Sequence, residues 1–462
     1  MTNWHPCIDD LPGPRYLAIA DALARDLAEG RLTPGTRLPT HRELAQRLGV
    51  TVGTVSRAYA EAERRGLTFG EVGRGTFVQE QSKSAIGPAV PPRTPGNIDL
   101  SIIRPSEDLY APLLAEAMRD LANRKDLGQL LSYSPYGGLP QHRAAGAEWV
   151  RQCGLAAEPQ QVIVTSGAQH GLAVTIAALT EPGDLLLTES ISYTGITAIA
   201  TQLHRRRVQG LEMDEYGIRP DALEAACRSG QARALVCVPT LHNPTTVTMS
   251  EERRRQIAQI AREHDLKIID DDVYGFLLPD GPPPLASFAP ERSCYVTSLS
   301  KALVPGLRVG YVLAPERWVE AIAASVRTSV WMPSPLTAEI ASLWIQDGTA
   351  LYLAERQREE AAIRQAIARR ILGPWQPQTR DTAFHLWLHI PEHWRTDVFC
   401  QEALNRGVSV IDGDVFVVGR GIQPHAVRIC LTAPRSRDEL EKGLSVLAEL
   451  LSTARTPRRA VI

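Results

Sequence analysis

A proline-bearing stretch with no apolar periodicity has the composition of a linker between two domains. Residues 79–97 contain Pro88, Pro91, Pro92 and Pro95, and their apolar residues recur at neither helix nor strand spacing. Such a stretch is expected to be extended and semi-rigid, so its roughly nineteen residues can span about 50 Å or more. We therefore predict a small domain over residues 12–78, a linker over 79–97 and a large domain over 98–455.

The large domain alternates short apolar runs with helical segments. Runs at residues 161–165, 185–188, 234–238, 267–269 and 294–296 predict strands, and residues 251–264 predict one of the intervening helices. This alternation is typical of α/β folds with a mainly parallel sheet and right-handed crossovers. After about residue 334 the pattern changes to a long helix over 337–371 and then to short elements, which predicts a smaller C-terminal subdomain.

Lys301 lies in a tight Ser-rich loop directly after the apolar run 294–296. Burial at a strand end and the nearby Arg308 would lower the pKa of its amine, which can then form a Schiff base with an aldehyde. The hydroxyls of Ser298 and Ser300 and the guanidinium of Arg308 suit a phosphate dianion. These residues predict half of a pyridoxal phosphate (PLP) site, although the motif alone is equally compatible with a solvated surface loop.

Asp271, at the end of another predicted strand, is the candidate partner of the pyridine nitrogen. An anion there keeps the ring protonated, and the protonated ring is the electron sink of PLP chemistry. The three consecutive carboxylates Asp270 to Asp272 could instead mark a solvated strand end or a metal site. No His or Cys lies nearby at metal-ligand spacing, so we expect no metal.

Residues after three further strands suit the remaining parts of the cofactor. Asn243, after the run 234–238, can donate to the phenolate oxygen, and Tyr193, after the run 185–188, can stack on the ring. A strand, a small-residue turn and a helix start at Gly167, Ala168 and Gln169 offer backbone N–H groups for the phosphate.

The order of these motifs over about residues 98–451 resembles the fold-type I aminotransferases of class I/II. The resemblance implies that Lys301 carries PLP as a Schiff base, that Asp271 pairs with the ring nitrogen and that Tyr193 stacks. It also implies that Asn243 and Tyr274 hold O3′. The phosphate ligands that it implies are Gly167, Ala168, Gln169, Ser298 and Arg308, and the Ser300 hydroxyl remains a candidate from the residue pattern alone.

Two more residues match positions of that family. Tyr133 resembles the tyrosine that reaches the neighbouring cofactor in a homodimer, and Arg428, in the apolar run 427–431, resembles the arginine that binds the substrate carboxylate. An arginine inside an apolar strand needs a partner, whereas an arginine on an edge strand could simply be solvated.

The small domain has the pattern of a winged helix-turn-helix. Residues 17–29 place apolar side chains on one helix face. Thr40 and Glu43 have the spacing of a capping box that opens a helix to Leu48, Gly49 ends this helix, and a second helix runs over residues 51–65. The second of two such helices enters the major groove by its N-terminal end. Residues 67–78 then predict a glycine-turned hairpin with a basic tip, which would be a wing.

Residues 12–78 resemble the GntR-type winged helix, including its G-x-L-x-P-G and G-R-G-T-F-V signatures. Residues 1–80 hold ten Arg and ten Asp plus Glu, yet eight Arg face only four Glu between Arg31 and Arg74. A local excess of this kind attracts DNA phosphates. The contacts that we predict from it come from Arg42, Arg57 and Arg74.

The recognition helix opens with Thr51 and Thr54, which we include among the candidate DNA contacts. GntR relatives often have basic residues at the positions of Val52 and Ser56. The departure leaves two alternatives, contact with thymine methyl groups or weaker direct discrimination between bases.

A GntR head joined to an aminotransferase body resembles the MocR-type regulators. The resemblance implies a transcription regulator that binds a double-stranded DNA operator and senses an amino-acid or amine effector through PLP, and Arg428 favours an effector with a carboxylate. The alternative is a catalytically active aminotransferase with an accessory DNA-binding head, because every residue that the chemistry needs is retained.

Chain-wide features favour a cytoplasmic protein. The seven Cys include no C-x-x-C pair, which is typical of reduced thiols. The first residues lack the basic and apolar parts of a signal peptide. No apolar run reaches the roughly eighteen residues that span a membrane, so we expect no membrane partner.

Overall fold

The computed structural model describes residues 4–8, 14–28, 31–33, 35–64, 67–71, 75–78, 96–419 and 423–453. The chain forms two compact units, Met1–Ser84 and Ala85–Ile462, which are described separately below. Most of the predicted linker, residues 79–95, lies outside the described residues. None of the described helices is both long enough and apolar enough to cross a membrane.

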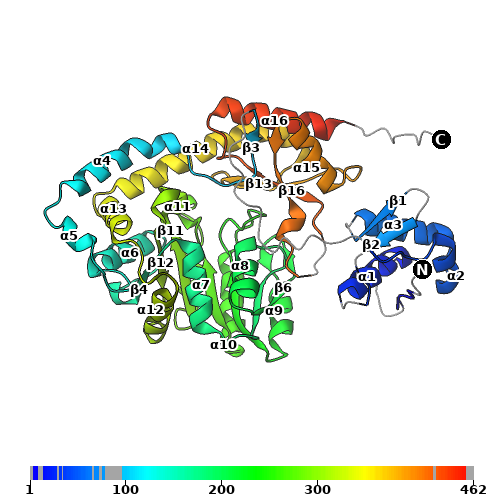
Figure 1. Cartoon of the computed structure of the whole chain (residues 1–462), viewed down its shortest axis with the longest axis horizontal. Coiled ribbons are helices and arrows are strands. Elements are labelled where there is room, and N and C mark those ends of the chain that lie inside the picture. Colours follow the sequence, from blue (N-terminus) through cyan, green and yellow to red (C-terminus); the bar gives the residue numbers. More distant parts are fainter. Residues whose placement is uncertain are drawn as a thin grey trace. The chain divides into compact units, whose positions relative to one another are not determined.

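The N-terminal unit is a helix-turn-helix followed by a two-stranded antiparallel hairpin (Figure 1). Thr40 caps the second helix as predicted, because its side chain accepts from the Glu43 N–H while the Glu43 carboxylate accepts from the Thr40 N–H. Gly49, at φ 64°, ends that helix in the left-handed region. The elements are α1 (Arg15–Ala28), α2 (His41–Leu48), α3 (Val52–Arg64), β1 (Thr68–Glu71) and β2 (Gly75–Val78).

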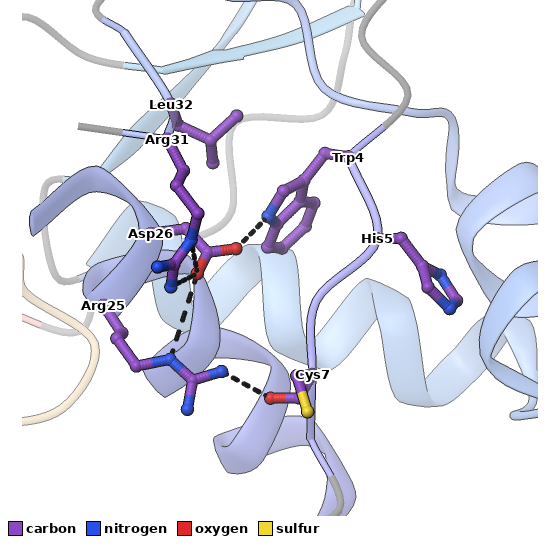
Figure 2. A pocket seen from close by; sticks show the side chains of 7 residues that line it. All are labelled: Trp4, His5, Cys7, Arg25, Asp26, Arg31 and Leu32. Carbon is purple, nitrogen blue, oxygen red and sulfur yellow. Dashed lines mark hydrogen bonds and ion pairs between the residues drawn. The ribbon is translucent and has the colours of Figure 1, made fainter. Parts of the chain in front are cut away.

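The segment that precedes α1 contributes Trp4 and Ile8 to the core of this unit. Figure 2 shows the Trp4 indole pointing at Asp26 of α1, to which it donates a hydrogen bond of 2.7 Å. Arg31 Nε donates to the same carboxylate at 3.1 Å. Asp26 is 5% exposed, and these donors account for its burial in an otherwise apolar core. The pocket beside them, which Figure 2 shows, is therefore explained by the packing of the N-terminal segment on α1 and is not proposed as a ligand site.

The larger unit is built on a seven-stranded, mainly parallel sheet, as predicted. Its strand order is β4-β12-β11-β10-β9-β5-β6, and β12 alone runs antiparallel to its two neighbours. Helix α7 packs against β10, β11 and β12, and α12 packs on α7. The strands are β4 (Val162–Thr165), β5 (Leu185–Glu189), β6 (Arg207–Leu211), β9 (Ala232–Cys237), β10 (Lys267–Asp271), β11 (Ser293–Ser298) and β12 (Gly310–Leu313).

Helices precede and connect the strands of this sheet. They are α4 (Ala111–Ala122), α5 (Leu127–Leu130), α6 (Pro140–Gln152), α7 (Ala168–Leu179), α8 (Thr194–Ala198), α9 (Pro220–Cys227), α10 (Glu251–Glu263), α11 (Leu299–Ala302) and α12 (Glu316–Val330). A short antiparallel pair, β7 (Met213–Asp214) and β8 (Gly217–Ile218), precedes α9.

A three-stranded antiparallel sheet of order β13-β16-β15 forms the C-terminal part, and α14, α15 and α16 share its apolar core. The pair β3 (Ile98–Asp99) and β14 (Val408–Ser409) joins the beginning of the unit to this part. Its other elements are α13 (Pro335–Gln346), α14 (Thr349–Leu372), β13 (His385–His389), α15 (Thr396–Asn405), β15 (Ile411–Asp412), β16 (Ala426–Cys430) and α16 (Arg437–Ser452).

The single long helix predicted over residues 337–371 is wrong. The structure has two helices, α13 and α14, separated at Asp347 and Gly348. Gly348 adopts φ 87°, and the Asp347 carboxylate accepts a hydrogen bond of 2.8 Å from the N–H of Thr349, the first residue of α14. An Asp-Gly turn signal therefore outweighs the apolar periodicity on either side of it.

Candidate functional site

The turn between β4 and α7 brings three predicted phosphate ligands to a helix N-terminus. Gly167 adopts φ 85° as the N-cap of α7, and a Cβ at this position would lie 2.7 Å from a terminal nitrogen of Arg308. Only glycine fits both constraints. The turn presents the N–H groups of Ala168 and Gln169 at the start of the helix, where anions are favoured.

Arg308 and Ser300 lie beside this turn, as the sequence predicts. The Arg308 guanidinium donates to the Ser166 carbonyl at 3.3 Å and to the Ser300 hydroxyl at 3.4 Å. Ser298, the N-cap of α11, accepts from the Ser300 N–H at 3.1 Å and contacts the Val309 carbonyl at 3.1 Å. Its hydroxyl therefore also shapes the loop that carries Lys301.

Lys301, on α11, is partly buried. Its Nζ donates to the Ile103 carbonyl at 2.7 Å. The pKa of the amine is lowered to about 8, chiefly by burial, with the cations of Arg428, Arg308 and Arg104 contributing and Cys430 opposing the shift. A solvated surface lysine, the alternative for this motif, is excluded by this burial.

Asp271 stands at the end of β10 with 3% of its surface exposed. Within the described residues, its Oδ1 has no hydrogen-bond partner, and burial together with the charges of Asp272, Asp270 and Glu189 raises its pKa. Asp270 and Asp272 are also buried, so the run is not a solvated strand end. A buried carboxylate without a donor matches a protonated pyridine nitrogen, and the residues present fit PLP in this respect.

The flanking carboxylates have partners of their own. Asp270 accepts from the Ala286 N–H at 2.9 Å, and Asp272 accepts from the Tyr295 hydroxyl at 3.1 Å. Both lie within the electrostatic influence of the fully buried Arg254 of α10. Among the residues that the structure describes, no group of three His, Cys, Asp or Glu side chains could hold a metal ion.

Arg428 lies on the central strand of the C-terminal sheet, so the edge-strand alternative is wrong. Its guanidinium donates to Asn243 Oδ1 at 2.8 Å and to the Ser101 carbonyl at 2.7 Å, and it lies 4.8 Å from the centroid of the Phe416 ring. The side chain is buried, yet it pairs with no carboxylate in the described part of the chain. Such a cation can accept a carboxylate from a ligand without losing an internal ion pair.

Two aromatic residues complete the buried part of the site. Tyr193 is the residue before α8, and a Cβ at Gly195 would lie 2.3 Å from its ring. Burial raises the pKa of Tyr193, with Asp271 adding to the effect and Arg428 and Arg308 opposing it. Tyr274 is 3% exposed, and its ring centroid lies 6.0 Å from that of His385.

Tyr133 is not brought into this interior. Its side chain is 83% exposed and meets Trp331 edge-on, with ring centroids 6.0 Å apart.

Sequence reasoning missed the residues that orient the predicted ones. His170 accepts a hydrogen bond of 3.0 Å from the Ser166 N–H and so fixes the start of the turn before α7. Burial lowers the pKa of His385 to about 3, and its Nε2 lies 3.3 Å from the His242 carbonyl. The contact of His385 joins segments 143 residues apart, which no local pattern could have indicated, whereas that of His170 spans four residues.

Three of the candidate DNA contacts that the structure describes, Arg42, Thr51 and Arg57, are exposed in the N-terminal unit. Arg42 and Arg57 are exposed and form no hydrogen bond or ion pair with other described residues. Thr51 is exposed at the start of α3, and Thr54 is half-buried. Arg74 lies outside the described residues.

The comparisons with known proteins agree with both parts. Residues 15–78 match the family described as bacterial regulatory proteins, gntR family, and residues 98–447 match aminotransferase class I and II. The uncharacterized HTH-type transcriptional regulator YdeF of Bacillus subtilis is 32% identical over 449 residues, which are 97% of each chain. The HTH-type pyridoxine biosynthesis transcriptional regulator PdxR of Corynebacterium glutamicum is 28% identical over 368 residues, 77% of this chain and 78% of that one.

Solved structures resemble the larger unit. An archaeal alanine:glyoxylate aminotransferase superposes with a TM-score of 0.71 at 25% identity, over 77% of this chain and 90% of that chain. Fold and site thus define a helix-turn-helix protein with an aminotransferase-like body. The chain belongs to the MocR-type family of HTH-type transcriptional regulators, in which a gntR helix-turn-helix is joined to a class I and II aminotransferase domain.

Proposed function

We propose that this protein is a PLP-dependent transcription regulator whose body binds an amino-acid or amine effector and thereby alters the binding of its head to a double-stranded DNA operator. The observation that carries the proposal is the constellation of the partly buried Lys301 with the buried Asp271 and Arg428. It combines an amine of lowered pKa, a carboxylate that lacks a donor and a guanidinium that lacks an anion.

Each residue has a defined task in this proposal. The amine of Lys301, largely deprotonated above pH 8, holds the cofactor covalently, and Asp271 keeps the proton on its ring nitrogen. When bound, PLP supplies the electron sink for chemistry at an amino carbon. Asn243 and Tyr274 hold O3′, and Tyr193 stacks on the ring. The phosphate is held by Gly167, Ala168, Gln169, Ser298, Ser300 and Arg308.

Arg428 selects the effector class. Paired, charge-assisted hydrogen bonds from a buried guanidinium favour a carboxylate over a neutral group. An amino acid meets both this requirement and that of the amine that exchanges with Lys301.

The head supplies the DNA contacts. Arg42, Arg57 and Arg74 neutralise phosphates, while Thr51 and Thr54 lie at the N-terminal end of the recognition helix, where such helices approach the bases. The domain boundaries in this proposal are 12–78, 79–97 and 98–455, with the small subdomain from about residue 334, and the protein acts in the cytoplasm.

A homodimer is part of the proposal. Tyr133, Tyr136 and Trp331 expose 83%, 43% and 52% of their surfaces, an apolar cluster that a second copy would cover. Tyr133 would then reach the cofactor phosphate of the partner, and two-fold symmetry would require paired DNA half-sites.

A working aminotransferase with an accessory head is the second candidate. The complete buried site favours it, because no residue required for the chemistry is replaced.

An absorbance titration tests the PLP and effector proposals together. The purified protein with PLP should show a band near the visible edge that shifts when certain amino acids are added and not when their amines without carboxylate are added. Equal responses to both series would remove the carboxylate requirement, and the lack of any such band would refute the PLP proposal.

A further inference from the structure

The N-terminal end of α3 presents an apolar side chain where recognition helices read bases. Val52, the first residue of α3, has 45% of its surface exposed. The core face of the same helix is formed by Val55, Ala58, Tyr59 and Ala62, so Val52 is not required for the packing of this unit.

The polar side chains around Val52 are engaged within the protein. The hydroxyls of Thr51 and Thr54 lie 2.9 Å apart, and Thr51 also accepts a hydrogen bond of 3.2 Å from the Thr54 N–H. The Ser56 hydroxyl lies 3.4 Å from His41 Nδ1. Residues 51–56 include no Arg, Lys, Asn or Gln, the side chains that fork to guanine or adenine.

Gly53 leaves the space beside Val52 open. A Cβ at Gly53 would meet only the Thr51 hydroxyl, at 3.8 Å. Internal packing would therefore allow a larger residue here and does not explain the glycine. The exposed residues of this helical turn are therefore Val52, Gly53 without a side chain, and Thr51, whose hydroxyl is bonded to Thr54. Such a surface can approach the floor of the major groove, where thymine carries a methyl group.

We propose that Val52 reads a thymine by packing against its 5-methyl group, once in each half-site of the operator. The inference rests on the proposed DNA-binding function, and it specifies thymine as the base that α3 selects. Burying one methyl group between apolar surfaces corresponds to about a fourfold gain in affinity for each half-site. Arg42 and Arg57 would then supply affinity that does not depend on sequence.

The test uses the full-length protein and DNA that it selects from a random library. Each thymine of the selected half-site is replaced in turn by deoxyuridine, which lacks the 5-methyl group and keeps the base-pairing edge. At one position of each half-site, the replacement should weaken binding by the wild-type protein about fourfold. Val52→Ala should bind the thymine and deoxyuridine sites equally, and circular dichroism should show it folded, because the residue is exposed.

Two further variants separate this contact from general loss of affinity. Arg57→Ala should weaken binding to both sites alike and keep the fourfold preference. Val52→Arg, when used to select DNA afresh, should replace that thymine by guanine, because arginine forks to the guanine edge. The inference is overturned if deoxyuridine has no effect at any position, or if Val52→Ala keeps the preference. A wild-type protein that selects no DNA sequence would overturn the proposed function as well.

Discussion

The two units of this molecule place their functional side chains in opposite environments. The body buries Asp271 and Arg428 and partly buries Lys301 among other charges, which shifts the pKa values of Lys301 and Asp271. Among the described residues, Asp271 and Arg428 each keep a buried polar atom without a hydrogen-bond partner. The head leaves Arg42, Arg57 and Val52 on its surface. A small-molecule site of this kind depends on a few groups that cannot be replaced, whereas a DNA-binding surface adds many small contributions.

The largest effect is expected for Lys301→Ala in the body. This variant should lose all covalently held PLP and keep its fold. Within the described part of the chain, the Lys301 amine bonds to a backbone carbonyl and to no side chain, so the core does not depend on it. Borohydride reduction followed by mass spectrometry measures the attached cofactor, and Lys442→Ala, an exposed lysine on α16, is the matched control. Reducible PLP on the Lys301 variant would show that another residue carries the cofactor.

Arg428→Gln should weaken binding of carboxylate effectors by about 10- to 100-fold, because two charge-assisted hydrogen bonds are lost. PLP binding should persist, since no cofactor contact is assigned to this side chain. Spectral titration of the holo-protein measures both quantities. If the variant lost PLP and effector binding together, Arg428 would be a structural residue of the site.

The rate of PLP capture should rise about tenfold per pH unit below pH 8 and level off above it. The folded pKa of Lys301, about 8, lies below its usual 10.5, so the neutral, reactive amine becomes the main form as the pH passes 8. Between pH 8 and 10.5 the Lys301 amine is therefore protonated in the unfolded chain and largely neutral in the folded chain. The free energy of unfolding of the cofactor-free protein should rise as the pH is raised from 8 to 10.5.

Arg104→Gln should move the capture profile to higher pH, because the charge of Arg104 lowers the Lys301 pKa. Stopped-flow absorbance measures the profile. An unchanged midpoint would place Arg104 outside the electrostatic reach of the amine.

Substitutions of single arginines in the head should have smaller effects than those in the body, and the effects on DNA affinity should be similar to one another. Arg42→Ala or Arg57→Ala should each weaken DNA binding severalfold and reduce the slope of log affinity against log salt by about 0.9. Arg228→Ala, an exposed arginine of the body, is the control. A single head variant that abolished binding at all salt concentrations would contradict the additive description of this surface.

The smallest effect concerns helix caps. Thr40→Ala should destabilise the head by about 1 kcal/mol and Ser436→Ala the body by a similar amount, because each removes a side-chain bond to a helix N–H. Urea unfolding, followed in each variant, should move one transition at a time. A shift of both transitions in either variant would mean that the two units do not unfold independently.

Sequence predicted best what is encoded locally. The capping box at Thr40, the turn at Gly167 and the strands that end at the site residues follow from patterns within a few residues, and the structure has them. The break at Gly348 does not follow from apolar periodicity, which continues on both sides of it, but from the Asp-Gly turn signal. Trp4 was missed because its partner Asp26 lies on another element.

The features of the site that the sequence does not predict depend on tertiary contacts. The bond from Arg428 to Asn243 and the bond from Lys301 to the Ile103 carbonyl join residues 185 and 198 positions apart. Motif order brought Lys301, Asp271 and Arg308 into one site, but the lowered pKa of Lys301 depends first on its burial in the folded chain and then on charges from several segments.

The most direct test of the regulator proposal records two signals from one sample of holo-protein with labelled operator DNA. Amino acids are added while cofactor absorbance and DNA-bound fluorescence anisotropy are followed. The account predicts that the compounds that shift the absorbance also change DNA affinity, and that Lys301→Ala abolishes both responses. Absorbance shifts without any change in DNA affinity, together with transaminase activity and neighbouring-gene transcription that survive deletion of residues 1–80, would contradict it.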